Sequence, residues 1–271
     1  MRPSAAKVIM ALAATAFLAG AASAQTTTRL YDHVHMSVPD PQEAAQWYHD
    51  HIGGEWVDGR TDRLLFGTTR IMFLGNRGNT RKPSAGGAID HLGFSYTDLA
   101  ARVADTEAAG ATLEGPIREI PGLFKLAFIV DPWGTRLELV EDEQHLGFHH
   151  IHLRAPDPVE TLQWYEDTFG GVRMNLRGFA PLEGLLYPGN VWILVTRGDT
   201  FPSSEGTIDH IGWRAPDAAP TLADLTARGI EITSEPREMT LPSGMIEFFY
   251  VAGPHGARVE LVDRAPDMRY Q

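Results

Sequence analysis

Three histidines stand close together in the stretch GFHHIHLRAPD, residues 147–157: His149, His150 and His152. An imidazole can bind a divalent metal or carry a proton near neutral pH, so this cluster marks a candidate site. One of the three belongs to a pattern found four times, a histidine seven residues before an aspartate, although histidine fills only 11 of 271 positions. The pattern pairs His33 with Asp40, His91 with Asp98, His150 with Asp157 and His210 with Asp217.

Two glutamates occupy matched positions in the two halves of the chain. Glu138 in GTRLELVE and Glu260 in GARVELVD each follow, by four residues, the glycine of a Pro-x-Gly turn. Two neutral imidazoles and one carboxylate leave positions on a metal open for substrate and for water or O₂. This donor set suits Fe(II), and it also suits Mn(II) or Zn(II).

Repeated elements must position these side chains. After each histidine strand, the aspartate is a candidate helix N-cap, apolar residues recur at helical spacing, and glycine ends the segment. Short runs typical of strands follow, so each unit is a strand, a helix and about three strands over about 55–60 residues. A larger period of about 120 residues predicts two domains, 29–144 and 147–266, of two units each.

This organisation resembles the vicinal oxygen chelate superfamily, through its paired βαβββ units, first-strand histidines and terminal G-x-x-(V/L)-E-L strands. The superfamily includes glyoxalase I, the bleomycin and fosfomycin resistance proteins and the extradiol ring-cleaving dioxygenases. The resemblance covers essentially all of the chain after residue 24. It implies an α+β fold in which paired units form two domains, each a cup-shaped mixed sheet with flanking helices and with the metal inside the cup.

First-strand histidines that face one cup would bring two imidazoles together, and a glutamate would complete each set. Because the superfamily places its ligands at these positions, we expect one set from each half. The sets are His33, His91 and Glu138 in the first half and His150, His210 and Glu260 in the second.

Two further side chains are candidates for catalysis. His152 shares the face of His150 and is interpreted as a proton shuttle, a substrate contact or a simple lining residue, while His149 is expected to face away at the surface. The stretch FFYVAGPHGARVE, residues 248–260, resembles the extradiol dioxygenase signature, which places an active-site tyrosine at Tyr250. Phe128 stands at the matching place in the first half, so the second half is the better candidate for catalysis.

Four other residues are candidates for substrate binding. Arg154 and Arg214 lie four residues beyond His150 and His210, where they could hold a carboxylate or a phenolate. Trp192 and Phe248 could line an aromatic pocket, although core packing is the commoner use of such side chains.

The ligands alone do not select a reaction. Glyoxalase I would add a carboxylate from the last strand of the first unit in each pair, but RIMFLG and VWILVTR contain none. We therefore favour an extradiol-type dioxygenase with Fe(II) and a small aromatic diol, in which His152 would have to supply the missing acid–base histidine. Two alternatives stay open: a metal-dependent glyoxalase, lyase, isomerase or resistance-type transferase, and a protein of the bleomycin-resistance kind that sequesters a ligand.

The N-terminal segment and the composition of the chain indicate where the protein is located and which partners it can have. Residues 1–24 combine a basic start, the apolar run VIMALAATAFLAG and an Ala-x-Ala site, which predicts a signal peptide cleaved near Ala24 and a periplasmic or secreted protein. The chain has no cysteine, which excludes disulfides and thiolate ligands. A net charge of −12 argues against nucleic acid and anionic membranes as partners. A small-molecule substrate is the expected partner, and a homo-oligomer stays open.

Overall fold

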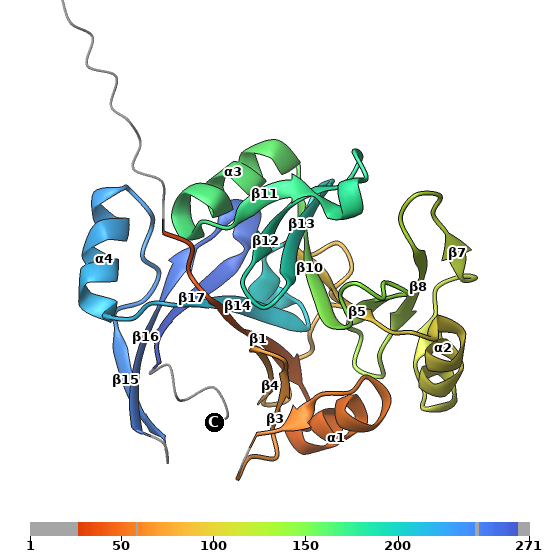
Figure 1. Cartoon of the computed structure of the whole chain (residues 1–271). Helices are drawn as coiled ribbons and strands as arrows, with labels where there is room; N and C mark the ends of the chain where they lie inside the picture. Colours follow the sequence, from red (N-terminus) through yellow and green to blue (C-terminus); the bar gives the residue numbers. More distant parts are fainter. Residues whose placement is uncertain (1–26, 58, 242–243, 265–271) are drawn as a thin grey trace, which may run out of the picture.

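The computed structural model describes residues 27–57, 59–241 and 244–264 (Figure 1). The predicted signal peptide, residues 1–24, lies outside these ranges. Within them, no helix is both long enough and apolar enough to cross a membrane. Two mixed sheets and four α-helices make up the described chain, so the predicted α+β class is confirmed.

Four units with the same order of elements follow one another, each opening with a long strand and an α-helix. The helices are α1 (Pro41–His51), α2 (Leu99–Ala108), α3 (Pro158–Phe169) and α4 (Ala218–Ala227). The strands of the first two units are β1 (Tyr31–Val38), β2 (Glu55–Trp56), β3 (Arg63–Phe66), β4 (Thr69–Gly75), β5 (Ile89–Ser95), β6 (Thr112–Leu113), β7 (Arg118–Glu119), β8 (Lys125–Val130) and β9 (Arg136–Val140). Those of the last two are β10 (Gly147–Ala155), β11 (Val172–Asn175), β12 (Glu183–Tyr187), β13 (Val191–Arg197), β14 (Ile208–Arg214), β15 (Arg237–Leu241), β16 (Gly244–Ala252) and β17 (Arg258–Asp263).

The two sheets mix the two halves of the sequence. The first sheet has the order β15-β16-β17-β14-β1-β4-β3-β2, and the second has the order β11-β12-β13-β10-β5-β9-β8-β6. The first unit is therefore joined to the fourth, and the second unit to the third. The joining contact in each sheet is an antiparallel pair of first strands, β1 with β14 and β5 with β10.

The predicted helix caps form in three of the four units. Asp40, Asp98 and Asp157 each accept hydrogen bonds from backbone N–H groups in the first turn of the following helix. Asp217 does not: its backbone is left-handed, with φ 64°, and its side chain makes no capping hydrogen bond. Its role as an N-cap is therefore a wrong prediction, because this backbone conformation differs from the extended one that a capping side chain needs.

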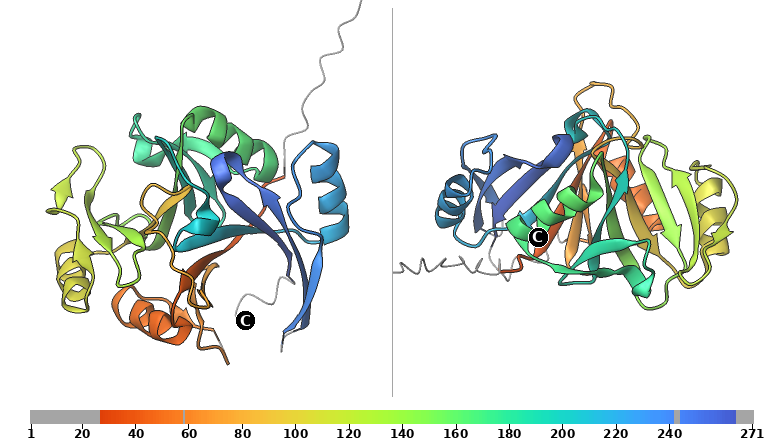
Figure 2. Two further views of the ribbon diagram at one scale, coloured as in Figure 1. Left: turned by 180° about the vertical axis from the view of Figure 1, so that it is seen from behind. Right: turned by 90° about the horizontal axis from the view of Figure 1, so that it is seen from above.

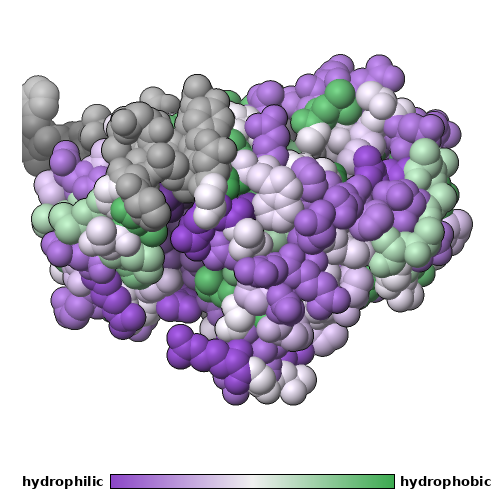
Figure 3. Space-filling model, turned by 90° about the horizontal axis from the view of Figure 1, so that it is seen from below, coloured by the Kyte–Doolittle hydropathy of each residue, from purple (hydrophilic) through white to green (hydrophobic). Residues whose placement is uncertain are grey.

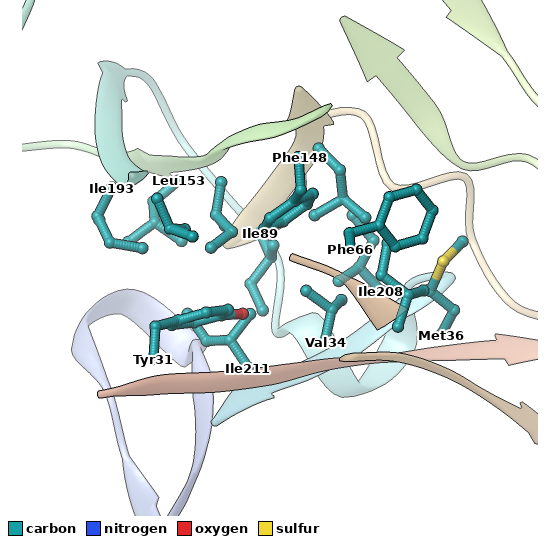
Figure 4. Packing of buried hydrophobic residues seen from close by; sticks show 14 of the residues in the cluster. Tyr31, Val34, Met36, Phe66, Ile89, Phe148, Leu153, Ile193, Ile208 and Ile211 are labelled. Carbon is teal, nitrogen blue, oxygen red and sulfur yellow. The ribbon is translucent and has the colours of Figure 1, made fainter. Parts of the chain in front are cut away.

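A large apolar core lies between the two sheets and under the helices (Figure 4). On β1, Val34 and Met36 point into this core, so alternation turns His33 and His35 to the opposite face. Full burial of each large apolar side chain stabilises the fold by about 1.5–3 kcal/mol. The histidine-bearing faces are thus fixed by the packing of the residues between them.

The helices α2 and α4 lie at opposite ends of the molecule (Figures 1 and 2). Seen from below, the surface is mainly hydrophilic with scattered hydrophobic side chains, in keeping with the acidic composition (Figure 3). Two smaller apolar clusters lie apart from the main core, one around Trp192 and Leu126 and one around Ile246 and Val262.

Candidate metal centres

Four side chains on the first sheet bring their donor atoms together, and we call this cluster centre 1: His33, His35, His210 and Glu260. One ligand atom from each lies within 4.8 Å of the others. His210 Nε2 is 3.0 Å from Glu260 Oε2, and His33 Nε2 is 3.7 Å from Glu260 Oε1. All except His35 are buried, so His35 is the member of the cluster that is most exposed to solvent.

The second sheet carries a matching cluster, centre 2: His91, Glu138, His150 and His152. Glu138 Oε2 lies 3.1 Å from His91 Nε2 and 3.2 Å from His150 Nε2. His152, like His35, is the most exposed member of its cluster. The molecule therefore contains two centres with the same donor set, three imidazoles and one carboxylate.

The predicted positions come together, but the predicted sets do not. His33 meets His210 and Glu260, while His150 meets His91 and Glu138, so the first-strand histidines of the first and third units are exchanged between the sets. The physical reason is the sheet order, because β1 is hydrogen-bonded to β14 and β10 to β5. Assignment of ligands by sequence half was wrong.

Two glycines make this pairing of first strands sterically possible. In the antiparallel registers, His33 faces Gly212 and His150 faces Gly93. A Cβ on Gly212 would lie 2.3 Å from the His33 ring, and one on Gly93 would lie 2.1 Å from the His150 ring. Only glycine leaves room for these imidazoles.

The same registers place a third histidine in each centre. His35 faces His210, and His152 faces His91. The sequence holds the signal for this pairing: the first and third units read His-x-His, and the second and fourth read His-x-Gly. His152, interpreted from sequence as a proton shuttle or substrate contact, thus lies among the possible metal donors.

The donor atoms fit a metal ion. Among the described residues, the buried nitrogens His33 Nε2, His35 Nδ1, His150 Nε2 and His152 Nδ1 have no hydrogen-bond partner. Buried polar atoms are rarely left in this state, and a coordinated ion would satisfy all of them. Imidazoles with a carboxylate are the donors that Fe(II), Mn(II) and Zn(II) accept.

Carboxylates on the preceding residue orient three of these histidines. His33 Nδ1 donates to Asp32 at 2.8 Å, His91 Nδ1 to Asp90 at 2.6 Å and His210 Nδ1 to Asp209 at 2.6 Å. Such a hydrogen bond fixes the ring and leaves Nε2 free for a metal. Sequence reasoning missed these residues, although Asp-His occurs in three of the four units.

His150 has a different support. Its Nδ1 lies 2.8 Å from His149 Nδ1, and His149 Nε2 lies 3.4 Å from Asp142 Oδ2. His149 is fully buried, so the expectation that it lies on the surface was wrong. Alternation fails here because the register of β10 against β5 shifts between Phe148 and His150.

The electrostatics of the centres favour ionised carboxylates. Burial alone would raise the pKa of Glu138 and Glu260, but the neighbouring imidazoles outweigh it and hold the pKa of both well below the ordinary value. Burial lowers the pKa of His150 to about 4, and it also holds the pKa of His152 and His35 well below the ordinary value. A neutral imidazole beside a carboxylate is the state in which these groups bind metal.

The aromatic residues beside the glutamates distinguish the centres. Tyr250 pairs with Glu260 across β16 and β17, and its ring lies 5.1 Å from that of His210. Phe128 takes the same place beside Glu138. Burial and the negative charge of Glu260 raise the pKa of Tyr250, so its hydroxyl keeps its proton and can donate a hydrogen bond. In the structure, this tyrosine belongs to centre 1.

The predicted substrate-binding residues divide into two groups. Phe248 lies beside Tyr250, with ring centroids 6.1 Å apart, so it can line centre 1. Trp192 is paired in register with His150, but it packs in the apolar cluster around Leu126, and its ring lies 6.3 Å from that of His145. Arg154 instead donates to the carbonyl of Asp199 at 2.9 Å and belongs to neither cluster. Arg214 donates to Asp32, the residue that supports His33.

Two arginines that precede the glutamates do not pair with them. Arg258 Nη1 bonds Asp209 at 2.9 Å and its guanidinium lies 3.8 Å from the Tyr250 ring centroid. Arg136 repeats this arrangement, with Asp90 at 3.1 Å and the Phe128 ring at 4.0 Å. Each arginine therefore supports the carboxylate that orients a histidine of its centre.

Known structures share this fold. Glyoxalase I from Zea mays matches with a TM-score of 0.67 at 17% identity, over 87% of this chain and 92% of that chain. A candidate dioxygenase from Bacillus subtilis matches with a TM-score of 0.61 at 18% identity, over 88% of this chain and 86% of that chain. At such identities the likeness concerns the fold alone. Among curated protein sequences, none matches this chain.

The sequence itself carries the family signature twice. The family described as Glyoxalase/Bleomycin resistance protein/Dioxygenase superfamily matches residues 30–139 and again residues 147–261. Together, these matches span most of the chain and all of the donor residues of both centres. The chain therefore belongs to the Glyoxalase/Bleomycin resistance protein/Dioxygenase superfamily, which includes metal-dependent enzymes.

Proposed function

We propose that the protein is a metal-dependent enzyme that binds a small substrate through two neighbouring oxygen atoms and moves a proton on it, as an isomerase or lyase. The observation that carries this proposal is the fourth donor, His35 in centre 1 and His152 in centre 2. If all four side chains held one six-coordinate ion, two positions would be left for other ligands. Those positions would suit the two oxygens of one substrate and would leave no place for O₂ beside it.

The side chains around each centre have separate tasks. A bound divalent ion would polarise a substrate oxygen and stabilise negative charge on it. In centre 1, Phe248, Ile246 and Val262 supply an apolar wall that excludes water and strengthens electrostatic interactions. The Tyr250 hydroxyl is positioned to donate to an oxygen bound near Glu260.

Proton exchange provides the test. The protein is reconstituted with Fe(II), Mn(II) or Zn(II) and mixed with hydroxyacetone in D₂O under nitrogen. NMR then measures the exchange of substrate protons for deuterium. We expect metal-dependent exchange of the proton next to the carbonyl, and loss of exchange when His210→Ala and His91→Ala are combined. The proposal would be contradicted if turnover of the substrates in a wider panel strictly required O₂.

The second candidate is the extradiol-type ring cleavage of a small aromatic diol with Fe(II). The placement of Tyr250 between Phe248 and Glu260, as in the dioxygenase signature, favours it. In this reaction His35 would remain off the metal, so that the 2-His-1-carboxylate set leaves room for O₂. Oxygen uptake by the Fe(II) protein with a panel of catechols would select this candidate over proton transfer.

A further inference from the structure

Met72 lies beside centre 1 on β4, a strand that carries none of its four donors. Its Sδ atom lies 3.3 Å from His35 Nε2, and the residue is 4% exposed. The neighbours Ile71 and Phe73 belong to the main apolar core, but Met72 belongs to none of the three apolar clusters of the described chain. Alternation along β4 therefore turns the thioether away from the core and toward the histidines of centre 1.

The strand position of Met72 is the one from which the glutamates reach their centres. In the second unit, Glu138 faces Gly93, which stands two residues after a first-strand histidine, and the fourth unit repeats this pairing. In the first unit, the residue two positions after His33 is His35, and it faces Met72. All of these registers are parallel, so the same strand geometry directs Met72 and Glu138 toward the histidine-bearing face. Met72 therefore occupies a donor position of the repeated unit.

Centre 2 has a hydrocarbon side chain at the matched position. Leu194 faces His152 in the parallel pair of β10 and β13, and it packs in the apolar cluster around Trp192. Because such a side chain cannot bind a metal ion, the two centres share three imidazoles and one carboxylate but differ by one sulfur atom. The thioether of Met72 therefore distinguishes centre 1 and does not follow from the fold.

The contact between Met72 and His35 fits two donors of one ion. Metal–nitrogen and metal–sulfur bonds of about 2.0–2.3 Å place neighbouring donors roughly 3–4 Å apart, and these two atoms are 3.3 Å apart. A thioether is a soft, polarisable donor that selects Cu(I), and imidazole also binds copper. Carboxylates instead suit harder divalent ions. Centre 1 therefore offers a soft donor set as well as the set that includes Glu260.

We propose that Met72 is a metal donor of centre 1, so that this centre binds Cu(I) through its imidazoles and the thioether, whereas centre 2 favours divalent ions. The inference rests on the metal-binding part of the proposed function and does not depend on the proposed reaction. With Zn(II), Mn(II) or Fe(II), centre 1 uses Glu260 and the thioether stays off the ion. The two centres therefore differ in metal preference although their other donors match.

Competition with the chelator bicinchoninate measures Cu(I) binding by the full chain, under nitrogen and with ascorbate as the reductant. We expect one tightly held Cu(I) in the parent chain and an affinity lower by about 10-fold or more in Met72→Leu, because one soft donor is lost. The Zn(II) affinity of both centres should change little. Leu194→Met is the matched variant, since it places a thioether beside His152 and should create a second tight Cu(I) site. Both substitutions nearly conserve side-chain volume, so the fold should tolerate them.

X-ray absorption at the copper edge identifies the donor atoms themselves. The chain has no cysteine, so a sulfur atom bound to Cu(I) must belong to a methionine. We expect sulfur at about 2.3 Å from copper in the parent chain, and its loss in Met72→Leu. Copper bound by nitrogen and oxygen alone, or equal Cu(I) affinities in Met72→Leu and the parent chain, would overturn the inference. Neither readout involves turnover, so a failure of the proposed proton transfer would leave both unchanged.

Discussion

His33 Nε2 lies 3.7 Å from Glu260 Oε1, although these residues come from the first and the last strands of the described chain. The contact exists because β1 lies next to β14, which in turn lies next to β17. Neither centre can therefore be completed by one half of the sequence. Each depends on the packing of the two halves against each other.

Gly212→Ala should disrupt centre 1 by steric conflict. The added methyl group would lie 2.3 Å from the His33 ring, which is fully buried and cannot move aside. We expect a loss of about 1–3 kcal/mol in the free energy of unfolding, together with the metal of centre 1. Gly75→Ala is the control, since its methyl group would meet only Pro41 at 3.8 Å. Denaturant unfolding and metal analysis measure both effects, and normal metal content in Gly212→Ala would refute this explanation.

The carboxylates behind the histidines should tune each centre separately. Asp90→Asn should weaken metal binding at centre 2 by about 10- to 100-fold, because His91 loses a charged hydrogen-bond partner. Asp209→Asn should have the same effect at centre 1 through His210. Competition with a chelator measures both affinities in one protein. Equal weakening of both centres by either substitution would show that these residues act on overall stability.

Tyr250→Phe should lower turnover at centre 1 by about 10- to 1000-fold, the scale expected for one lost hydrogen-bonding or acid–base group. The metal content should not change, because the three histidines and the glutamate that could hold the ion are left intact. Phe128→Tyr supplies the complementary variant at the matched place in centre 2. Rates measured with one substrate decide the matter, and an undiminished rate in Tyr250→Phe would remove this residue from the mechanism.

We propose that the protein is exported, and we expect its mature N-terminus at or near Gln25. The basic start, the apolar run and the Ala-x-Ala site of residues 1–24 support this proposal. Mass spectrometry of the protein from a periplasmic or secreted fraction measures the terminus. Accumulation of the full-length chain in the cytoplasm would contradict it.

Local patterns in the sequence predict much of this structure. The spacing from His33 to Asp40 places a strand before a capped helix, and the same spacing works in two further units. The positions of Glu138 and Glu260 after their turns also hold, since both reach a histidine cluster. These features depend on strand alternation, caps and turns, which neighbouring residues determine.

Features that depend on distant contacts were harder to predict. The partner of His33 is set by which first strands become neighbours, and repeats of one pattern leave several pairings open. His149 was assigned to the wrong environment because a register shift in β10 breaks alternation. Arg258 lies two residues before Glu260 in the sequence, yet it bonds Asp209 on the adjacent strand, a contact that spacing along the chain does not predict.

The assignment of histidines to the two centres is tested most directly by the number of metal ions bound to two double variants. Elemental mass spectrometry of the purified proteins measures this number. We predict two metal ions in the parent chain and one in His33→Ala, because that variant damages centre 1 alone. Adding His210→Ala to His33→Ala should cause no further loss, whereas adding His91→Ala should remove the remaining ion. The opposite result, with both ions lost in the His33 and His210 pair and one retained in the His33 and His91 pair, would contradict the exchange of ligands between the halves.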